Sequence, residues 1–186
     1  MTACGLTAAR RGANRPASIL RTPKPHRVTL MINNDVLRSV RYMLDLSDAH
    51  VATLVQYADP SVVLERDAVQ AYLLREDEPG FVPLDDRLLG LFLDGLVVHF
   101  RGARSDAPPR PPETRVNNNA VLKKLRVAFE LKDVDMMEIF ASAGRPVTKP
   151  ELSALFRQPG HKNFRLCGDQ LLRDFLRGLT LRVRGE

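Results

Sequence analysis

The stretch NNDVLRSVR at residues 33–41 returns as NNAVLKKLR at residues 118–126, an offset of 85 residues. A second block begins at Phe81 and Phe164 and repeats at an offset of 83 residues. Two blocks in the same order indicate two copies of one unit, with a two-residue deletion near Gly144 in the second copy. The pairs of the second block are Asp86/Asp169, Leu88/Leu171, Leu89/Leu172, Phe92/Phe175, Leu93/Leu176, Gly95/Gly178 and Leu96/Leu179.

Each copy carries the apolar spacing of four helices. The Asn pair that opens each copy is expected to cap the first helix, because a short side-chain oxygen can accept hydrogen bonds from the free amides of the first turn. Asp48 and Asp133 are expected to cap the second helix. Thr148 and Glu151 form a capping box before the third helix of the second copy. The fourth helix is expected over residues 86–100 and 169–183.

One glycine interrupts the apolar stripe of the fourth helix in each copy, at Gly95 and Gly178. A glycine inside a helix costs about 1 kcal/mol relative to alanine. Its presence at the same place in both copies therefore predicts that another helix approaches closely there. Together these patterns predict an all-α protein of two tandem four-helix repeats joined by a Pro-rich linker.

Composition divides the chain into four segments. Residues 1–30 hold six Lys and Arg and no acid, so we expect disorder there. This basic segment fits an organellar transit leader, or translated sequence upstream of a true start at Met31. Residues 103–116 contain four prolines and are expected to form an extended spacer. The two repeats then occupy residues 31–102 and 117–186.

The formal charge of +6 equals the charge of the first 30 residues. Residues 31–102 contain 6 basic and 12 acidic residues, a net charge of −6, whereas residues 103–186 contain 16 basic and 10 acidic residues, a net charge of +6. The folded part is therefore electrically bipolar. Either the surface charge of two old copies has drifted apart, or the halves attract each other or meet different partners.

Four short motifs resemble the YehS-like family, a bacterial family defined by a tandem domain of unknown function. They are NDVLRSVRY at residues 34–42, REDEPGF at residues 75–81, HKNFRLCGDQ at residues 161–170 and FLRGL at residues 175–179. The resemblance covers about residues 31–180 and supports a start near Met31. It brings with it no reaction, ligand or catalytic residue.

No catalytic or cofactor motif stands out in the sequence. The four histidines lack the spacing of metal ligands, and there is no Gly-rich phosphate loop or nucleophile elbow. Cys4 and Cys167 are too few for a disulfide scaffold or a zinc site, which favours a reducing, cytoplasmic setting. Cys167 is either a reactive thiol at a helix start or a small buried side chain. We expect no enzyme activity, no metal, no cofactor and no membrane span.

The loop between the third and fourth helices is the candidate binding site, because functional side chains concentrate on loops held by a rigid scaffold. We call residues 75–80 the acidic loop and residues 157–165 the basic loop; they occupy the same place in the two copies. A solvated connector is the alternative. The candidate residues for binding an anion or a partner are Arg157, His161, Lys162, Asn163 and Arg165.

Two Arg–Asp pairs are expected to stabilise the fold. Arg41 and Arg126 share one position on the first helix, and Asp86 and Asp169 share one at the start of the fourth helix. We expect each Arg to pair with the Asp of its own copy and so to tie the two helices together. A ligand-binding pair is the alternative.

Two functions from different classes follow. The first is a non-enzymatic helical interaction or regulatory protein that uses the basic loop to bind a protein partner or, through the acidic loop of another molecule, itself. The second is a nucleic-acid-binding protein with a loose helix-turn-helix-like element at residues 136–156. Its basic face would comprise Lys123, Lys124, Arg157, Lys162, Arg165, Arg173 and Arg177. No small-molecule substrate is indicated.

Overall fold

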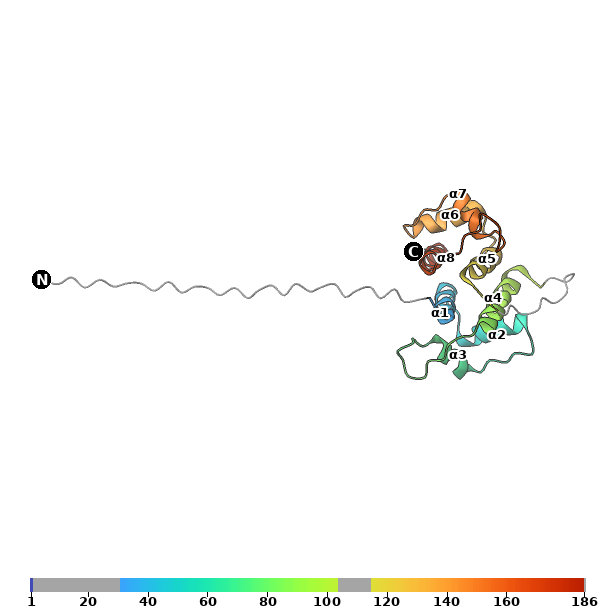
Figure 1. Cartoon of the computed structure of the whole chain (residues 1–186). Coiled ribbons are helices and arrows are strands. Elements are labelled where there is room, and N and C mark those ends of the chain that lie inside the picture. Colours follow the sequence, from blue (N-terminus) through green and yellow to red (C-terminus); the bar gives the residue numbers. More distant parts are fainter. Residues whose placement is uncertain (2–30, 104–114, 186) are drawn as a thin grey trace.

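The structure, a computed structural model, describes Met1, residues 31–103 and residues 115–185 (Figure 1). The expected disorder of residues 1–30 and the expected extended form of the Pro-rich linker concern segments that lie outside the described residues, apart from their ends. The helices and contacts below belong to the described part of the chain.

The described part contains eight helices and no strand, which confirms the predicted all-α fold of two four-helix repeats. The fourth helix of each repeat ends one residue later than expected. The helices of the first repeat are α1 (Asn33–Leu44), α2 (Asp48–Ala58), α3 (Arg66–Leu73) and α4 (Asp86–Arg101). Those of the second repeat are α5 (Asn118–Ala128), α6 (Asp133–Ser142), α7 (Lys149–Leu155) and α8 (Asp169–Arg184).

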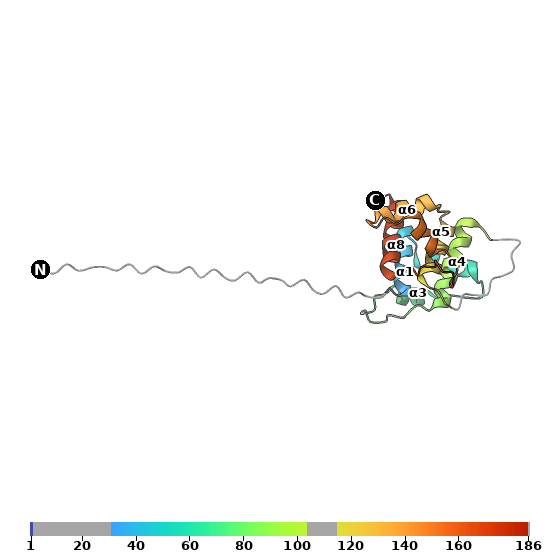
Figure 2. The ribbon, with the colours of Figure 1, turned by 45° about the horizontal axis from the view of Figure 1, so that its top comes forward.

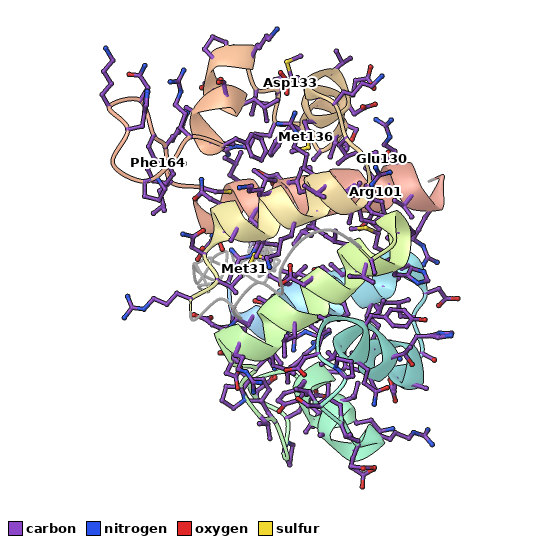
Figure 3. The ribbon with its side chains drawn as sticks, turned by 90° about the vertical axis from the view of Figure 1, so that its right-hand side faces the viewer. Met31, Arg101, Glu130, Asp133, Met136 and Phe164 are labelled. Carbon is purple, nitrogen blue, oxygen red and sulfur yellow. The ribbon has the colours of Figure 1, made fainter. Side chains whose placement is uncertain are left out.

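The two repeats interlock. Helix α1 packs on α8 and helix α5 packs on α4, so the first helix of each repeat contacts the fourth helix of the other repeat more extensively than that of its own. Figure 2 shows α1 and α8 side by side. These four helices form a central layer, which α2 and α3 cover at one end and α6 and α7 at the other (Figures 1 and 3).

Apolar side chains from both repeats form one continuous core. Its fully buried members include Phe92 of α4, Leu122 of α5 and Phe175 of α8. Burial of such a side chain contributes about 1.5–3 kcal/mol of favourable free energy to folding. Because the central layer draws on both repeats, neither repeat has a complete core of its own.

Gly95 and Gly178 lie where α4 crosses α2 and where α8 crosses α6. A Cβ atom at Gly95 would stand 1.6 Å from the carbonyl oxygen of Leu54, and one at Gly178 would stand 2.0 Å from that of Ile139. No side chain fits in these spaces. The predicted close approach of helices is therefore confirmed in both repeats.

The Asn pair that opens each repeat does not cap the first helix, contrary to the sequence prediction. The N-cap residues are Ile32 for α1 and Asn117 for α5, and the Asn117 side chain accepts a hydrogen bond from the amide of Ala120 at 2.9 Å. The Asn pair lies one residue farther on and turns inward. The caps of α2 and α6 are likewise Ser47 and Lys132, one residue earlier than predicted, whereas the capping box of α7 is confirmed.

Ion pairs between the repeats run in both directions: either repeat can supply the cation. In one contact the lysine belongs to the basic repeat and the acid to the acidic repeat, and only 11 % of the lysine side chain is exposed. In another contact the acidic repeat supplies the arginine and the basic repeat supplies the acid. The interface between the repeats therefore does not cancel their opposite net charges. The contacts are Lys124–Asp94 at 2.6 Å, Arg101–Glu130, and Arg184, which donates to the Tyr42 carbonyl at 2.8 Å.

Candidate interaction surface

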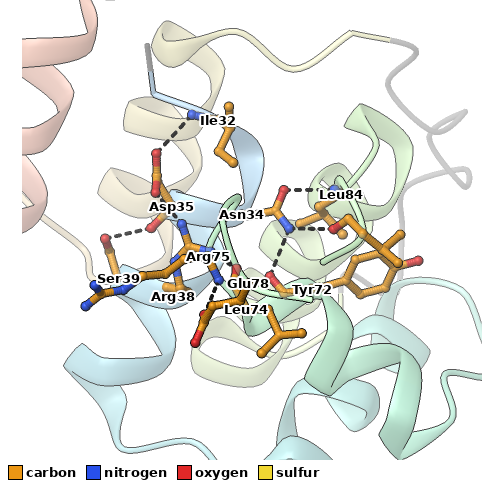
Figure 4. A network of polar contacts seen from close by, with 11 residues as sticks. Ile32, Asn34, Asp35, Arg38, Ser39, Tyr72, Leu74, Arg75, Glu78 and Leu84 are labelled. Carbon is orange, nitrogen blue, oxygen red and sulfur yellow. Dashed lines mark hydrogen bonds and ion pairs between the residues drawn. The ribbon is translucent and has the colours of Figure 1, made fainter. Parts of the chain in front are cut away.

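A buried asparagine holds both ends of the acidic loop in the first repeat (Figure 4). Asn34 is only 1 % exposed, and its Nδ2 atom donates to the carbonyl oxygens of Tyr72 and Val82, each at 2.9 Å. Its Oδ1 atom accepts from the amide of Leu84 at 2.9 Å. The end of α3 and the approach to α4 are thus both fastened to α1.

Asn119 makes the same contacts in the second repeat. Its Nδ2 atom donates to the carbonyl oxygens of Leu155 at 2.8 Å and Arg165 at 2.9 Å, and its Oδ1 atom accepts from the amide of Cys167 at 2.9 Å. The basic loop is therefore anchored at its two ends. Sequence reasoning missed this role, although the recurrence of the Asn pair together with the start of the fourth helix was the pattern that could have indicated it.

The acidic and basic loops have the same backbone hydrogen bonds despite their different sequences. Each loop consists of two consecutive tight turns, and then its chain returns to hydrogen-bond with the third helix of the repeat. In the first repeat the amides of residues 78, 81 and 82 donate to the carbonyl oxygens of residues 75, 78 and 71. In the second, the amides of residues 161, 164 and 165 donate to those of residues 158, 161 and 154.

A Pro-Gly pair shapes a different one of the two turns in each loop. Gly80 lies in the second turn of the acidic loop, and Gly160 lies in the first turn of the basic loop. Their φ angles are +91° and +92°, as a turn with Pro at its second position and Gly at its third requires. The remaining turn is free to carry charge, with Glu76 and Asp77 in the first repeat and Lys162 in the second.

Three cations give the basic loop its charge. Arg165 lies 3.2 Å from Glu151, and the pKa of that carboxyl is lowered by hydrogen bonds from Thr148 first and by Arg165 second. Arg165 is therefore partly neutralised. Arg157 and Lys162 are exposed, and within the described residues neither has an acidic partner.

His161 stands between the cations. Its Nε2 atom lies 2.9 Å from Nη1 of Arg157, and the amide of Asn163 points at its Nδ1 atom from 3.1 Å. A neutral imidazole has one acceptor nitrogen, so the ring can accept from only one of these donors at a time. These contacts tie the ring of His161 to Arg157 and to the backbone of the loop.

An open depression of about 500 Å³ lies between α7 and the basic loop. It combines apolar surface with two of the loop's cations and with Asn163, whereas His161 and Lys162 are not part of its lining. Figure 3 shows Phe164 at one side of the second repeat. The lining residues are Pro150, Glu151, Ser153, Ala154, Arg157, Asn163, Phe164 and Arg165. The structure thus gathers three of the five candidate residues around one hollow.

The predicted partners of Arg41 and Arg126 are wrong, because each arginine pairs with a different Asp. Arg41 lies 3.1 Å from Asp48, and Arg126 lies 2.8 Å from Asp133, so each Arg pairs with the first residue of the following helix. A left-handed residue after the first helix of each repeat turns the chain back and brings that Asp to the last turn. The pair therefore fastens the first helix to the second helix.

Asp86 and Asp169, the expected partners, bind asparagines. Asn33 and Asn118 each donate from Nδ2 to these carboxylates at 2.8 Å, so the first helix is tied to the start of the fourth by an amide instead of a guanidinium. Asp169 also accepts from the amide of Met31 at 2.9 Å, a contact between the two repeats.

Cys167 is a buried side chain directly behind the basic loop. Burial, and then the charge of Asp169, raise the pKa of its thiol to about 12. A thiol must ionise to act as a nucleophile or metal ligand, so this environment suits neither role. Among the described residues, no three His, Cys, Asp or Glu side chains come together as metal ligands would. Every helix found in residues 31–103 and 115–185 is too short or too polar to cross a membrane.

The basic side chains considered for nucleic-acid binding differ in their surroundings. Lys124 is engaged between the repeats and Arg165 is paired on its own repeat, whereas Lys123 and Arg177 are exposed on α5 and α8. Helix α7, which would be the reading helix, spans seven residues and buries two of its leucines. It offers little surface for a major groove.

Comparison with known proteins gives two findings. The family described as "Protein of unknown function (DUF1456)" matches the chain twice, over residues 33–102 and 118–185, one match for each repeat. The chain is 46 % identical to "Uncharacterized protein YehS" of Escherichia coli (strain K12) over 152 aligned residues. The aligned region covers 82 % of this chain and 96 % of that protein. No solved structure matches the chain significantly.

Proposed function

The chain belongs to the YehS-like family of tandem DUF1456 repeats, and we propose that it is a non-enzymatic interaction protein that binds an acidic segment of a protein partner at the basic loop. The observation that carries the proposal is the pair Arg157 and Lys162. These two exposed cations have no acidic partner among the described residues, and Arg157 lines an open, partly apolar depression.

The rigidity of the loop supports this use. Asn119 fastens both of its ends, and two tight turns fix the backbone between them. A loop that is already ordered loses little conformational entropy when it binds, so a modest number of contacts suffices.

The composition of the depression favours a peptide over a bare anion. Phe164, Ala154 and Pro150 offer apolar contact, while Arg157 and Arg165 offer guanidinium groups that can hold a carboxylate with two hydrogen bonds. Leu166, next along the chain, is 65 % exposed and extends the apolar surface. A segment with acidic and apolar side chains matches both features. We infer a reducing, cytoplasmic setting, since Cys167 is a free thiol.

Nucleic acid is the competing ligand, and one experiment separates the two. Fluorescence anisotropy of the full chain would be measured with a labelled Asp- and Glu-rich peptide that contains leucine, and in parallel with mixed-sequence RNA and DNA, each across a salt series. We expect the peptide to bind. The double variant Arg157→Glu, Lys162→Glu should weaken that binding about tenfold or more, since both cations contact the ligand.

The matched control is Lys123→Glu, Arg177→Glu, which reverses two exposed cations away from the loop and should leave peptide binding unchanged. The proposal is overturned if no peptide binds at low salt. It is also overturned if binding survives the loop reversal, because the six cations of residues 1–30 would then be responsible. Nucleic-acid binding that falls steeply with salt and weakens in the control variant would make the rival function the correct one.

A further inference from the structure

The acidic and basic loops are structural equivalents at opposite ends of the molecule. They share their backbone hydrogen bonds and their asparagine anchors, as described above. Figure 3 shows the basic loop, marked by Phe164, at one side of the second repeat, and Figure 1 shows α3 at the far end of the first. Equivalent positions thus carry opposite charge at the two ends of one molecule.

The acidic loop presents carboxylates to solvent. Glu76 and Asp77 are exposed and, within the part of the chain that the structure describes, take part in no hydrogen bond or ion pair. Glu78 turns back to accept from the amide of Arg75 and so orders the turn that carries the other two. The loop is therefore a short, pre-ordered acidic segment, followed by the apolar Phe81 and Val82, the latter 42 % exposed.

This segment has the chemistry inferred for the ligand of the basic loop. The two loops belong to different repeats, and among the described residues no hydrogen bond or ion pair joins them. We propose that the partner is a second copy of this chain, whose acidic loop docks on the basic loop and places Glu76 and Asp77 against Arg157 and Lys162. This inference rests on the proposed function and identifies its partner.

Such a contact joins unlike surfaces and therefore repeats head to tail. Every molecule added to an open chain leaves one free acidic loop and one free basic loop, so growth continues until the chain closes into a ring or concentration limits it. The interface is small and its charges are exposed, which makes it weak and sensitive to salt.

The test is sedimentation velocity of the full chain over a range of concentrations at low and high salt. We expect the weight-average sedimentation coefficient to rise with concentration at low salt and to lose that rise at high salt. The variant Glu76→Lys, Asp77→Lys and the variant Arg157→Glu, Lys162→Glu should each remain monomeric under the same conditions. Each weakens association about tenfold or more.

Rescue separates charge pairing from accidental damage to the fold. An equimolar mixture of the two double variants should associate, because one carries two basic loops and the other two acidic loops. A chain with all four substitutions should also associate, since its two loops have only exchanged signs. The matched control, Glu65→Lys with Arg177→Glu, alters exposed charges elsewhere and should behave as the unaltered chain does.

The outcomes also distinguish this inference from the proposed function. If the chain is monomeric at every concentration while the acidic peptide still binds the basic loop, the inference is overturned and the proposed function stands. If neither occurs, both are overturned. Association that persists in either double variant, or that the mixture fails to restore, places the self-contact elsewhere and also overturns the inference.

Discussion

Asn34 and Asn119 make the same three hydrogen bonds in the two repeats, although none of their partner residues is the same. This is possible because every partner is a backbone carbonyl or amide. A side chain that binds only backbone holds the shape of a loop and leaves the loop's own side chains free to change. The two loops could therefore acquire opposite charge on one backbone path.

Replacement of the anchor is expected to destabilise the whole chain. Asn119→Ala leaves the Leu155 carbonyl and the Cys167 amide buried without this partner, each at a cost of about 1–3 kcal/mol, so the free energy of unfolding should fall by about 2 kcal/mol or more. Chemical denaturation gives this value. The control is Asn117→Ala, which removes an exposed helix cap and should cost about 1 kcal/mol. Equal losses in the two variants would contradict the anchoring role.

The glycines at the helix crossings give a prediction whose sign is unusual. Gly178→Ala normally would stabilise a helix by about 1 kcal/mol. Here the new methyl group would stand 2.0 Å from the carbonyl oxygen of Ile139, so α8 and α6 must separate and the loss should reach about 3 kcal/mol or more. Gly95→Ala should act alike. The control is Gly168→Ala, where nothing lies within 4 Å and the change should stay under about 1 kcal/mol.

The features that could be predicted from the sequence are those that depend on local residue spacing. The repeat, the four helices of each copy and the close approach at Gly95 follow from residues a few positions apart. The interlocking of α1 with α8 could not be predicted, because the apolar stripe of a helix does not say which of two similar helices it will meet. That choice depends on packing across the whole layer.

The pairing of Arg41 was missed for a related reason. The turn that brings Asp48 beside it needs a left-handed residue after α1, and this residue is Asp45, with φ +51°. Residues other than glycine adopt that conformation uncommonly, so nothing in the sequence marked the turn. The opposite charges of the two loops, by comparison, could be predicted from the sequence, because they depend on residue types alone.

Interlocking predicts that neither repeat is stable alone. A polypeptide of residues 31–103 exposes the faces of α1 and α4 that α8 and α5 cover, and a core of this size is marginal even when complete. We expect residues 31–103 and 115–186 to lack cooperative unfolding as separate monomers and to form a one-to-one complex that unfolds cooperatively when mixed. Circular dichroism with heating checks this. Cooperative unfolding of either monomer alone would show that the repeats are independent.

The burial of Cys167 predicts slow thiol chemistry. With a pKa of about 12, its thiol is protonated at neutral and mildly alkaline pH, and its side chain is 2 % exposed. In a Cys4→Ser variant, we expect an aromatic disulfide reagent at pH 8 to react with Cys167 only after denaturant unfolds the chain. Rapid labelling of the folded variant would reopen the role of a reactive thiol.

The lowered pKa of Asp169 predicts how the stability of the fold responds to acid. Its pKa is lowered chiefly by the amide of Met31, then by Asn118 and by the charge of Arg173, so the folded state prefers the carboxylate. For a lowered pKa, the stabilisation is complete above the ordinary value of about 3.9 and disappears as pH falls through the folded value. The free energy of unfolding should therefore decline below about pH 4, and less steeply in Asp169→Asn.

Nuclear magnetic resonance titration of the Asp169 carboxyl tests the cause directly. Met31→Pro removes the amide donor and should raise the pKa of Asp169 most, and Arg173→Gln should raise it least, with Asn118→Ala between them. Because the Met31 donor belongs to the first repeat and Asp169 to the second, the Met31→Pro shift also tests this contact between the repeats. A titration midpoint for Asp169 that is the same in all three variants would mean that these contacts do not hold in solution.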